Sequence, residues 1–418
     1  MFLAALRARP SAWLALICFG RFGTMLISMS YAASIPTLMG PWDMSATTAG
    51  TVQTAFNAAN AVALPLASWL ADHFSARRIL LASAWLGAAA ALGFALFARS
   101  HDTAVLLFAL VGLSQAGTYT PTIMLIAGRY EVARRGAAIG WLLASSSLGY
   151  VGSLAVSGTA LATAGYQAAF LSCAVRPALG AILFTLSAFC GGATTAMPAA
   201  LSPPTAPRDD VPRRRDRSVV LLNIGYIGHS WELLGMSAWA PAFVTAAATA
   251  TAMSGAAASI AGAWLAGLLH LSGFTAALTM GRASDRLGRR RILAVVAAIG
   301  AACSFAFGWT IGLPLAVIAL FAAVYGFSAF GDSPVLSTAM TEAVAPGRLG
   351  RALAVRSVLG FGAGAVAPLA FGMVLDLTNP PGMPPTRWGW AFVLLGIGGV
   401  VAALCAWFLP KESQGTPR

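Results

Sequence analysis

The sequence has few charged residues for its length. Only 9% of its 418 residues are Asp, Glu, Lys or Arg, whereas 58% are hydrophobic and 44 are glycine. A soluble domain of this size needs more polar surface than this composition supplies, so we expect a polytopic membrane protein. Lysine is almost absent, and the only one is Lys411. Because a phosphate-binding P-loop requires Gly-Lys-Ser or Gly-Lys-Thr, an ATP-driven pump is excluded.

Cysteine is also scarce, and its pattern excludes disulfide frameworks and metal sites. The five cysteines lie in hydrophobic runs without C-x-x-C spacing: Cys18, Cys173, Cys190, Cys303 and Cys405. We interpret them as packing residues. The chain also contains no H-E-x-x-H motif and no G-x-S-x-G motif. We therefore expect no enzyme activity, no bound metal and no other cofactor.

Twelve hydrophobic runs, each long enough to cross a bilayer, make up most of the chain. They are predicted at residues 12–39, 47–69, 79–98, 103–127, 137–163, 168–191, 219–245, 256–280, 292–311, 314–340, 351–376 and 389–409. The first run follows two arginines and could be a signal peptide, but eleven more runs follow it. We therefore predict that it is retained as a membrane helix.

One long polar segment separates the sixth run from the seventh. Residues 193–217 are rich in proline and contain a mixed charge run, a composition that cannot form a packed core. The predicted organisation is an N-terminal six-helix bundle at 1–192, a cytoplasmic linker at 193–217, a C-terminal six-helix bundle at 218–410 and a cytoplasmic tail at 411–418. The predicted fold class is an all-α membrane protein with twelve transmembrane helices.

The positive charge follows the predicted topology. The formal net charge is +13. Most Lys and Arg residues fall in alternate loops and in the tails, whereas only Arg99 and Arg387 fall in the loops between them. This asymmetry is the positive-inside rule, which predicts that both termini are cytoplasmic. It therefore indicates a multi-pass protein of the cell (inner) membrane, and we expect no nucleic-acid partner.

The two predicted bundles repeat one another in sequence. Gly20, Gly23 and Pro36 in the first run have the same spacing as Gly225, Gly228 and Pro241 in the seventh. A short polar turn also occurs twice, at residues 68–80 and 281–293, and Asp72 of the first copy matches Asp285 of the second. Two parallel repeats are typical of secondary transporters, in which substrate lies between the halves near the middle of the membrane.

The second copy of this turn reads Gly-Arg-Ala-Ser-Asp-Arg-Leu-Gly-Arg-Arg-Arg-Ile-Leu, from Gly281 to Leu293. It resembles the signature G-x-L-A-D-R-x-G-R-R-x-x-L of the major facilitator superfamily, and the resemblance extends over essentially the full chain. The first copy departs from that signature at Ser68, His73, Ser75 and Ala76.

The resemblance implies the fold of that family and a role for the turns in gating. It implies that Asp72 and Asp285 cap the start of a helix in the opposite half in one conformation, where a carboxylate is favoured by the helix dipole. The arginines would close the cytoplasmic side. The candidate gating residues are Asp72, Arg77, Arg78, Gly281, Asp285, Arg286, Gly288, Arg289, Arg290 and Arg356.

Ionisable residues inside the predicted spans are the candidates for function, because they are costly in a membrane and usually face a polar interior. Arg21, Arg176, His229, Glu232 and His270 fall in the middle third of their spans, and Asp332 and Arg356 fall nearer the cytoplasmic side. His229 and Glu232, one turn apart, form a candidate proton-coupling pair together with Asp332.

Several of these residues have a second, structural interpretation. Arg356 and Asp332 fit a structural ion pair as well as a gate. Arg176 belongs to a helix that the resemblance places outside the central site, and His270 fits a packing role. The candidate substrate-binding residues are Arg21, Asn57, Tyr119, Tyr150, Tyr226 and His229.

The leading hypothesis is a proton-coupled carrier of a small organic anion, such as a carboxylate. Arginines and histidines outnumber carboxylates in the spans, which favours an anion, and Arg21 can bind its anionic group through two donors. The alternative is multidrug efflux of lipophilic cations by proton antiport, with Glu232 and Asp332 as the attracting charges. A non-transporting sensor on the same scaffold is a third alternative. We expect a monomer, and substrate identity and transport direction stay open.

Overall fold

The computed structural model describes residues 10–190, 212–344, 349–382 and 384–410. Within these ranges every regular element is a helix, which confirms the all-α prediction for this part of the chain. The predicted tail at 411–418 and residues 193–211 of the predicted linker lie outside the described residues. The rest of the predicted linker is already helical, because a helix begins at Pro212, where proline suits the first turn.

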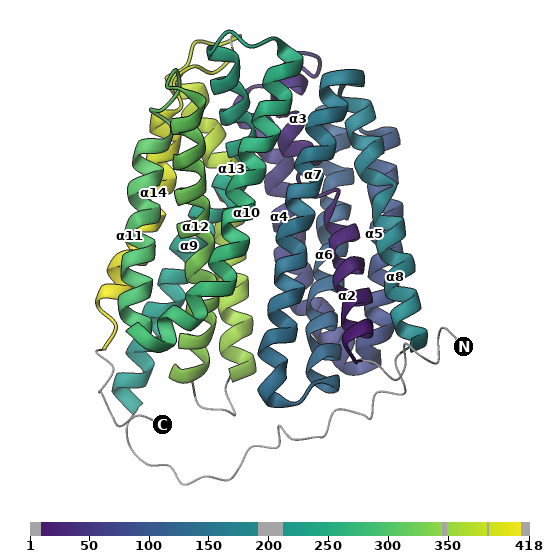
Figure 1. Cartoon of the computed structure of the whole chain (residues 1–418), viewed down its shortest axis with the longest axis vertical. Coiled ribbons are helices and arrows are strands. Elements are labelled where there is room, and N and C mark those ends of the chain that lie inside the picture. Colours follow the sequence, from purple (N-terminus) through teal and green to yellow (C-terminus); the bar gives the residue numbers. More distant parts are fainter. Residues whose placement is uncertain (1–9, 191–211, 345–348, 383, 411–418) are drawn as a thin grey trace.

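The helices form two bundles that stand side by side (Figure 1). The first half contains α2 (Pro10–Met25), α3 (Ser30–Leu38), α4 (Ala46–Leu70), the π-helix η1 (Ala71–Ser75), α5 (Ala76–Phe97), α6 (His101–Arg129), α7 (Val132–Ala174) and α8 (Arg176–Cys190). The second half contains α9 (Pro212–Ala250), α10 (Gly255–Leu287), α11 (Arg289–Phe307), α12 (Leu315–Ala343), α13 (Leu349–Thr378) and α14 (Gly389–Trp407). Each predicted span falls on one or more of these helices.

The outer surface of the bundles is apolar. Large side chains such as Phe19, Leu106, Leu320 and Leu377 are 64%, 65%, 65% and 83% exposed. Ten segments of the described chain are long and apolar enough to cross a membrane. Water would not favour such a surface, whereas lipid does. The fold is therefore that of a multi-pass membrane protein.

Two of the ten segments, of 52 and 56 residues, double back on themselves. In the first, Thr51 near the start of α4 lies 2.7 Å from His101 at the start of α6, so the chain descends along α4 and returns along α5. In the second, Ser157 lies 3.3 Å from Cys173, because α7 is interrupted at Gly165, whose φ of 80° is favourable only for glycine. Each segment therefore contains two antiparallel passes.

The first predicted span differs from a continuous helix. A turn at residues 26–29 separates α2 from α3. There the N–H of Met29 leaves the helical pattern and donates to Ser153 Oγ of α7 at 3.1 Å. The matching span of the second half, α9, continues through Pro241 without such a turn. The break follows from a contact between helices that the sequence of the span does not reveal.

The internal repeat is visible in how the helices pack. A Cβ added to Gly23 of α2 would lie 2.9 Å from the backbone of Gly180 in α8. A Cβ added to Gly228, its counterpart in α9, would lie 2.4 Å from the backbone of Gly398 in α14. In both halves the first pass and the last pass therefore approach backbone to backbone, and only glycine permits this approach.

Candidate functional site

Arg21 is buried in the first half and is held by neutral groups. Its side chain is 6% exposed. Nε donates to Ser146 Oγ at 2.9 Å, and Nη1 donates to Thr118 Oγ1 at 2.7 Å and to Gln115 Oε1 at 3.3 Å. The guanidinium also lies 5.4 Å from the centre of the Tyr119 ring. No carboxylate of the described residues pairs with it, so its charge is not neutralised there.

The arrangement around Arg21 leaves one end of the guanidinium unused. The hydrogen bonds employ Nε and Nη1, whereas Nη2 donates to no described residue. Three neighbours from α6 and α7 fix the orientation of the planar guanidinium group. A guanidinium held in this way keeps two N–H donors for a further acceptor.

The second half also contains a buried arginine, Arg356. It lies on α13, is 7% exposed, and donates through Nη2 to Ser337 Oγ at 3.1 Å. Its guanidinium stacks over the Tyr226 ring, 3.9 Å from the ring centre. The predicted alternative of an ion pair between Arg356 and Asp332 is wrong for this conformation. Among the described residues, Arg356 has no carboxylate partner.

Aromatic side chains connect the two arginines across the halves. Phe361 of α13 lies 6.2 Å from Tyr226, measured between ring centres. Phe361 and Tyr119 both pack against one small cluster on α4 and α6, formed by Ala63, Leu64 and Ala116. Arg21 and Arg356 therefore lie at opposite edges of one aromatic layer at the interface between the halves.

His229 makes a polar contact different from the predicted one. Its Nδ1 lies 2.8 Å from Asp332 Oδ1 of α12, and its Nε2 lies 2.9 Å from Ser333 Oγ. The distance to Asp332 is that of an ion pair, but the alignment is not that of a hydrogen bond, and Asp332 Oδ1 has no hydrogen-bond partner among the described residues. The predicted pair of His229 with Glu232 is replaced by a pair of His229 with Asp332.

Glu232 has a different hydrogen-bond partner from His229. It accepts a hydrogen bond from Ser304 Oγ of α11 at 2.6 Å. Its carboxylate would be 2.6 Å from a Cβ at Gly399 of α14 and 3.5 Å from one at Gly300. Residues three apart on a helix point about 60° apart, so two neighbours on one helix can face different partners. Glu232 therefore lies inside the second bundle rather than between the halves.

The other predicted binding residues occupy the middle of the interface. Asn57 is buried on α4, beside Gln53, whose Nε2 donates to Asn57 Oδ1 at 3.4 Å. Asn57 Nδ2 and Gln53 Oε1 have no partner among the described residues. Tyr150 of α7 lies 5.3 Å from His270 of α10, measured between ring centres. Sequence reasoning missed Gln53, although its spacing of one turn from Asn57 is a usable signal.

Arg176 does not belong to this group. It donates to the backbone carbonyl of Ser172 within the same half. This contact agrees with the structural interpretation of Arg176 and makes it a useful control for the buried arginines.

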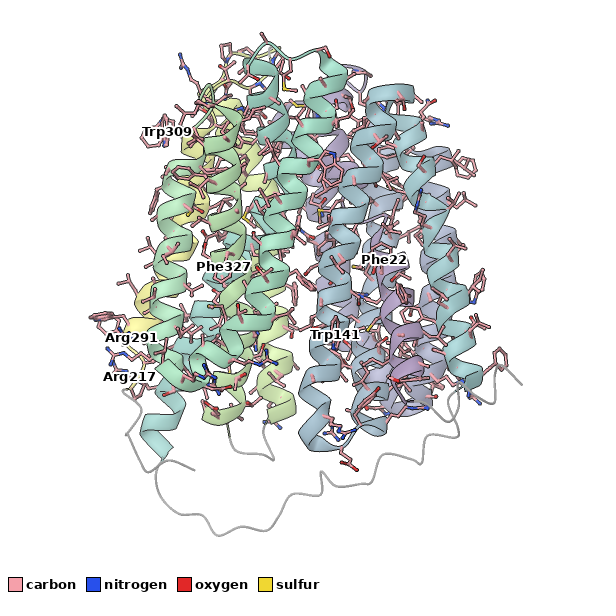
Figure 2. The ribbon with its side chains drawn as sticks, viewed as in Figure 1. Phe22, Trp141, Arg217, Arg291, Trp309 and Phe327 are labelled. Atoms are coloured by element: carbon pink, nitrogen blue, oxygen red, sulfur yellow. The ribbon has the colours of Figure 1, made fainter. Side chains whose placement is uncertain are left out.

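The halves are tightly packed at one end. A Cβ at Gly50 of α4 would lie 2.4 Å from the carbonyl oxygen of Pro368 in α13. A Cβ at Gly158 of α7 would lie 2.2 Å from Cβ of Ala263 in α10. Both contacts join the first half to the second. From Pro368, α13 continues to Asn379, which bonds to the carbonyl of Arg387, and Gly389 lies against Trp309. The contact of Gly50 is therefore on the side of the molecule that carries Trp309, which we call the opposite end because it lies opposite the end that carries Arg217 and Arg291 (Figure 2).

At the other end the same helices are apart. We call it the arginine-rich end, because Arg217 and Arg291 lie there (Figure 2). Five turns from the contact of Gly158 with Ala263, on the same faces of α7 and α10, lie Gly140 and Gly281. A Cβ at either glycine would meet no atom within 4 Å. α7 and α10 therefore touch at the opposite end and diverge toward the arginine-rich end.

At the arginine-rich end, two predicted gating residues of the second half, Asp285 and Arg289, pair with each other. Arg289 Nη2 lies 2.5 Å from Asp285 and 3.1 Å from Glu342 at the end of α12. Asp72 lies in η1, is exposed, and makes no hydrogen bond or ion pair with any residue that the structure describes. Arg290 lies over the Trp407 ring at 5.5 Å. Among the described residues, neither Asp72 nor Asp285 caps a helix of the opposite half in this conformation.

Comparison with a family model decides the family. The model of the major facilitator superfamily matches residues 17–278 and 232–418. The chain belongs to the major facilitator superfamily. This superfamily consists of membrane transporters, so the protein is a transporter rather than an enzyme. No functionally curated protein matches the sequence.

Solved structures of this superfamily share the fold. The nucleoside transporter NupG (D323A mutant) superposes with a TM-score of 0.71 at 15% identity, covering 96% of this chain and 100% of that one. The xylose transporter XylE from E. coli, in a partially occluded inward open conformation, gives 0.70 at 15% identity over 97% and 98%. A bacterial homologue of the human lysosomal transporter Spinster, inward-facing and occupied, gives 0.70 at 16% identity over 96% of both chains. Identities this low show the fold alone.

Proposed function

We propose that this protein is a proton-coupled secondary transporter of a small organic anion, which works by alternating access. In this proposal the chain crosses the cell membrane twelve times as two six-helix halves, 1–192 and 218–410, and works as a monomer. The arginine-rich end is cytoplasmic, in line with the positive-inside rule. The separation of Gly140 and Gly281 then corresponds to an inward-facing state.

One observation carries the choice of an anion. Arg21 and Arg356 are both buried, they come from opposite halves, and neither pairs with a carboxylate of the described residues. Burying a charge without a partner is costly unless a ligand supplies the opposite charge. An anion between the halves would contact Nη2 of Arg21 in the first half, and its charge would also attract Arg356 in the second half. The aromatic layer offers an apolar surface for the rest of the substrate.

The contact between His229 and Asp332 is the best candidate for proton coupling. A histidine side chain can take up and release a proton, and the carboxylate of Asp332, 2.8 Å from Nδ1, is a second proton-carrying group in contact with it. His229 also lies 5.5 Å from Tyr226, measured between ring centres, and Tyr226 is stacked under Arg356. A change of charge on His229 is therefore transmitted to the site proposed for the anion.

Efflux of lipophilic cations receives less support. That function would place carboxylates between the halves, where a cation could reach them. Asp332 faces His229, and Glu232 is enclosed by α11 and α14. Among the described residues, the charged groups with free donors at the interface are arginines, which repel a cation.

The charge sign can be tested by ligand stabilisation of the purified protein. A bound ligand raises the unfolding temperature by mass action. We expect small mono- and dicarboxylates to stabilise the protein, and Arg21→Gln to abolish this effect. Arg176→Gln, which removes an arginine outside the interface, serves as the matched control and should leave the effect unchanged. Stabilisation by tetraphenylphosphonium that persists in Arg21→Gln would instead support cation efflux.

A further inference from the structure

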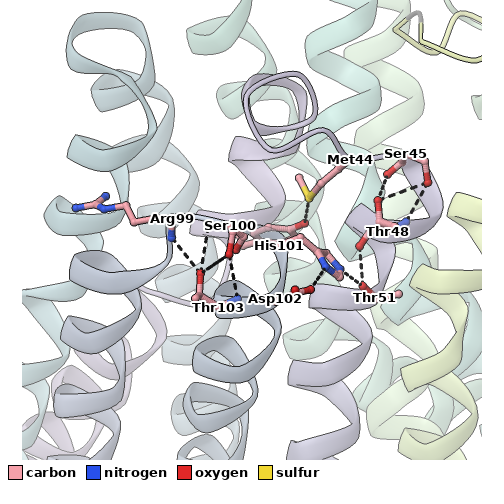
Figure 3. A network of polar contacts seen from close by, with 10 residues as sticks. Met44, Ser45, Thr48, Thr51, Arg99, Ser100, His101, Asp102 and Thr103 are labelled. Atoms are coloured by element: carbon pink, nitrogen blue, oxygen red, sulfur yellow. Dashed lines mark hydrogen bonds and ion pairs between the residues drawn. The ribbon is translucent and has the colours of Figure 1, made fainter.

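The start of α4 has backbone donors that the helix itself cannot use. The first N–H groups of any α-helix lack intrahelical acceptors. Ser45 precedes α4 and accepts the N–H of Thr48 at 3.2 Å through Oγ (Figure 3). The N–H groups of Ala46 and Thr47 remain, and both are bound by a residue of the other half.

That residue is Asp376, near the end of α13. Its Oδ1 accepts the N–H of Ala46 at 2.9 Å, and its Oδ2 accepts the N–H of Thr47 at 2.8 Å. Oδ2 also accepts the Thr47 hydroxyl at 2.5 Å. A negative charge at a helix N-terminus is favoured by the helix dipole. One carboxylate of the second half thus completes the N-terminus of a helix in the first half.

This cap requires the halves to be closed at the opposite end. Next to it, a Cβ at Gly372 of α13 would lie 2.2 Å from the carbonyl oxygen of Ala46. One turn before Gly372, the N–H of Leu369 donates to Thr54 Oγ1 at 3.2 Å. The first is a close approach of two backbones and the second a hydrogen bond from backbone to side chain, so a few ångströms of separation would break both together with the cap.

We infer that Asp376 is a gating residue that stabilises the conformation closed at the opposite end. The inference rests on the proposed alternating access, because it needs a second conformation in which the cap is broken. In that conformation water replaces the carboxylate at Ala46 and Thr47. The cap therefore contributes to the balance between the two states without touching the substrate.

The antiparallel packing of α4 and α13 gives this cap a counterpart at the other end. α13 runs antiparallel to α4: it begins at Leu349, toward the end at which α4 leads into Asp72 of η1, and it ends beside the start of α4, where Asp376 lies. A carboxylate thus lies near the end of each helix, next to the start of its partner. Asp376 forms its cap in this conformation, whereas Asp72 has no hydrogen-bond partner among the described residues. Asp376 and Asp72 therefore stabilise opposite states of one helix pair.

A disulfide between α7 and α10 can report the balance between the states. Gly140→Cys and Gly281→Cys place two thiols on facing positions that come within bonding distance only when the arginine-rich end closes. The five native cysteines are replaced by alanine in every variant. The measured quantity is the fraction of protein that forms the disulfide under mild oxidation, scored by the loss of maleimide-reactive thiols. No substrate is needed, so the test is independent of the proposed anion.

We expect Asp376→Asn in this background to raise the ratio of cross-linked to free protein about two- to fivefold, the usual effect of losing a favourable charge at a helix N-terminus. Asp102→Asn is the matched control, because Asp102 is 94% exposed, lies at the start of α6 near α4, and contacts only His101 (Figure 3). It should leave the ratio unchanged.

Asp72→Asn distinguishes a shifted balance from simple destabilisation. It should lower the cross-linked ratio, and the double variant with Asp376→Asn should return toward the parent value. Unfolding temperatures close to the parent value would exclude misfolding. An unchanged ratio in Asp376→Asn, or the same change in Asp102→Asn, would overturn the inference. If Asp376→Asn fails to fold, Thr47→Val tests the same cap by removing only the hydroxyl bond, and an unchanged ratio in that variant overturns it as well.

Discussion

Replacing Arg21 by lysine tests how the proposed substrate is bound. Arg21 uses Nε and Nη1 for Ser146, Thr118 and Gln115, and it keeps Nη2 free. Lysine preserves the positive charge but has a single ammonium group, which cannot satisfy these neighbours and also reach an anion in the same direction. The charge of the site is therefore kept while its geometry is lost.

The expected loss of affinity follows from the hydrogen bonds involved. A hydrogen bond to a charged group contributes about 1.5–3 kcal/mol. If Arg21→Lys loses one such bond to the substrate, the dissociation constant should rise about 10- to 100-fold. The change should also lower the unfolding temperature of the unliganded protein, because lysine leaves some of the buried groups of Ser146, Thr118 and Gln115 without their donor, so affinity is measured at a temperature at which both proteins are folded.

The assay is equilibrium binding of the best stabilising carboxylate to purified protein, with Arg176→Lys as the control. Arg176 contacts the backbone of Ser172 and lies away from the other half. We expect Arg176→Lys to bind with the parent affinity. If Arg21→Lys also binds within about twofold of the parent affinity, then Arg21 only organises its neighbours, and the proposed contact with the substrate is refuted.

Three further predictions concern coupling, packing and topology. His229→Gln should retain counterflow exchange but lose accumulation driven by a pH gradient. Glu232→Gln should retain both activities, because Glu232 lies inside the second bundle. Equal losses in the two variants would contradict this prediction. Gly50→Ala should reduce transport severely, because the added Cβ would lie 2.4 Å from the carbonyl oxygen of Pro368. Gly362→Ala is the control and should transport normally, because a Cβ there meets no atom within 4 Å. A topology reporter fused at Arg99 should be accessible from outside the cell, and an inside location would reverse the assignment of the two ends.

Much of the fold could be predicted from hydrophobic length alone. A bilayer requires about 20 apolar residues for each crossing, so the runs mark the helices to within a few residues. The internal repeat was also predictable, because Gly23 and Gly228 stand at matching positions and both pack against a glycine of the last helix in their half. The turn at residues 26–29 was not predictable, since the Met29 N–H bonds to Ser153, 124 positions away.

The candidate site was predicted in part. Arg21 stood out because a charge far from the ends of a membrane helix must point into protein. The partner of His229 was predicted wrongly, because sequence spacing brings Glu232 close along α9 but does not reveal where the two side chains point. The neighbouring helices decide this, and α12 places Asp332 beside His229 while α11 places Ser304 beside Glu232.

The sequence by itself determined the class of protein, the helices, the repeat and the presence of uncompensated positive charge within the spans. These features depend on composition and local spacing, which the chain carries at every position. Only the tertiary structure decided which charges meet and which end is closed. Asp376 shows the reason: it lies 330 positions from Ala46, yet its carboxylate completes the first turn of α4. Such a contact arises only where two antiparallel helices from different halves pack against each other.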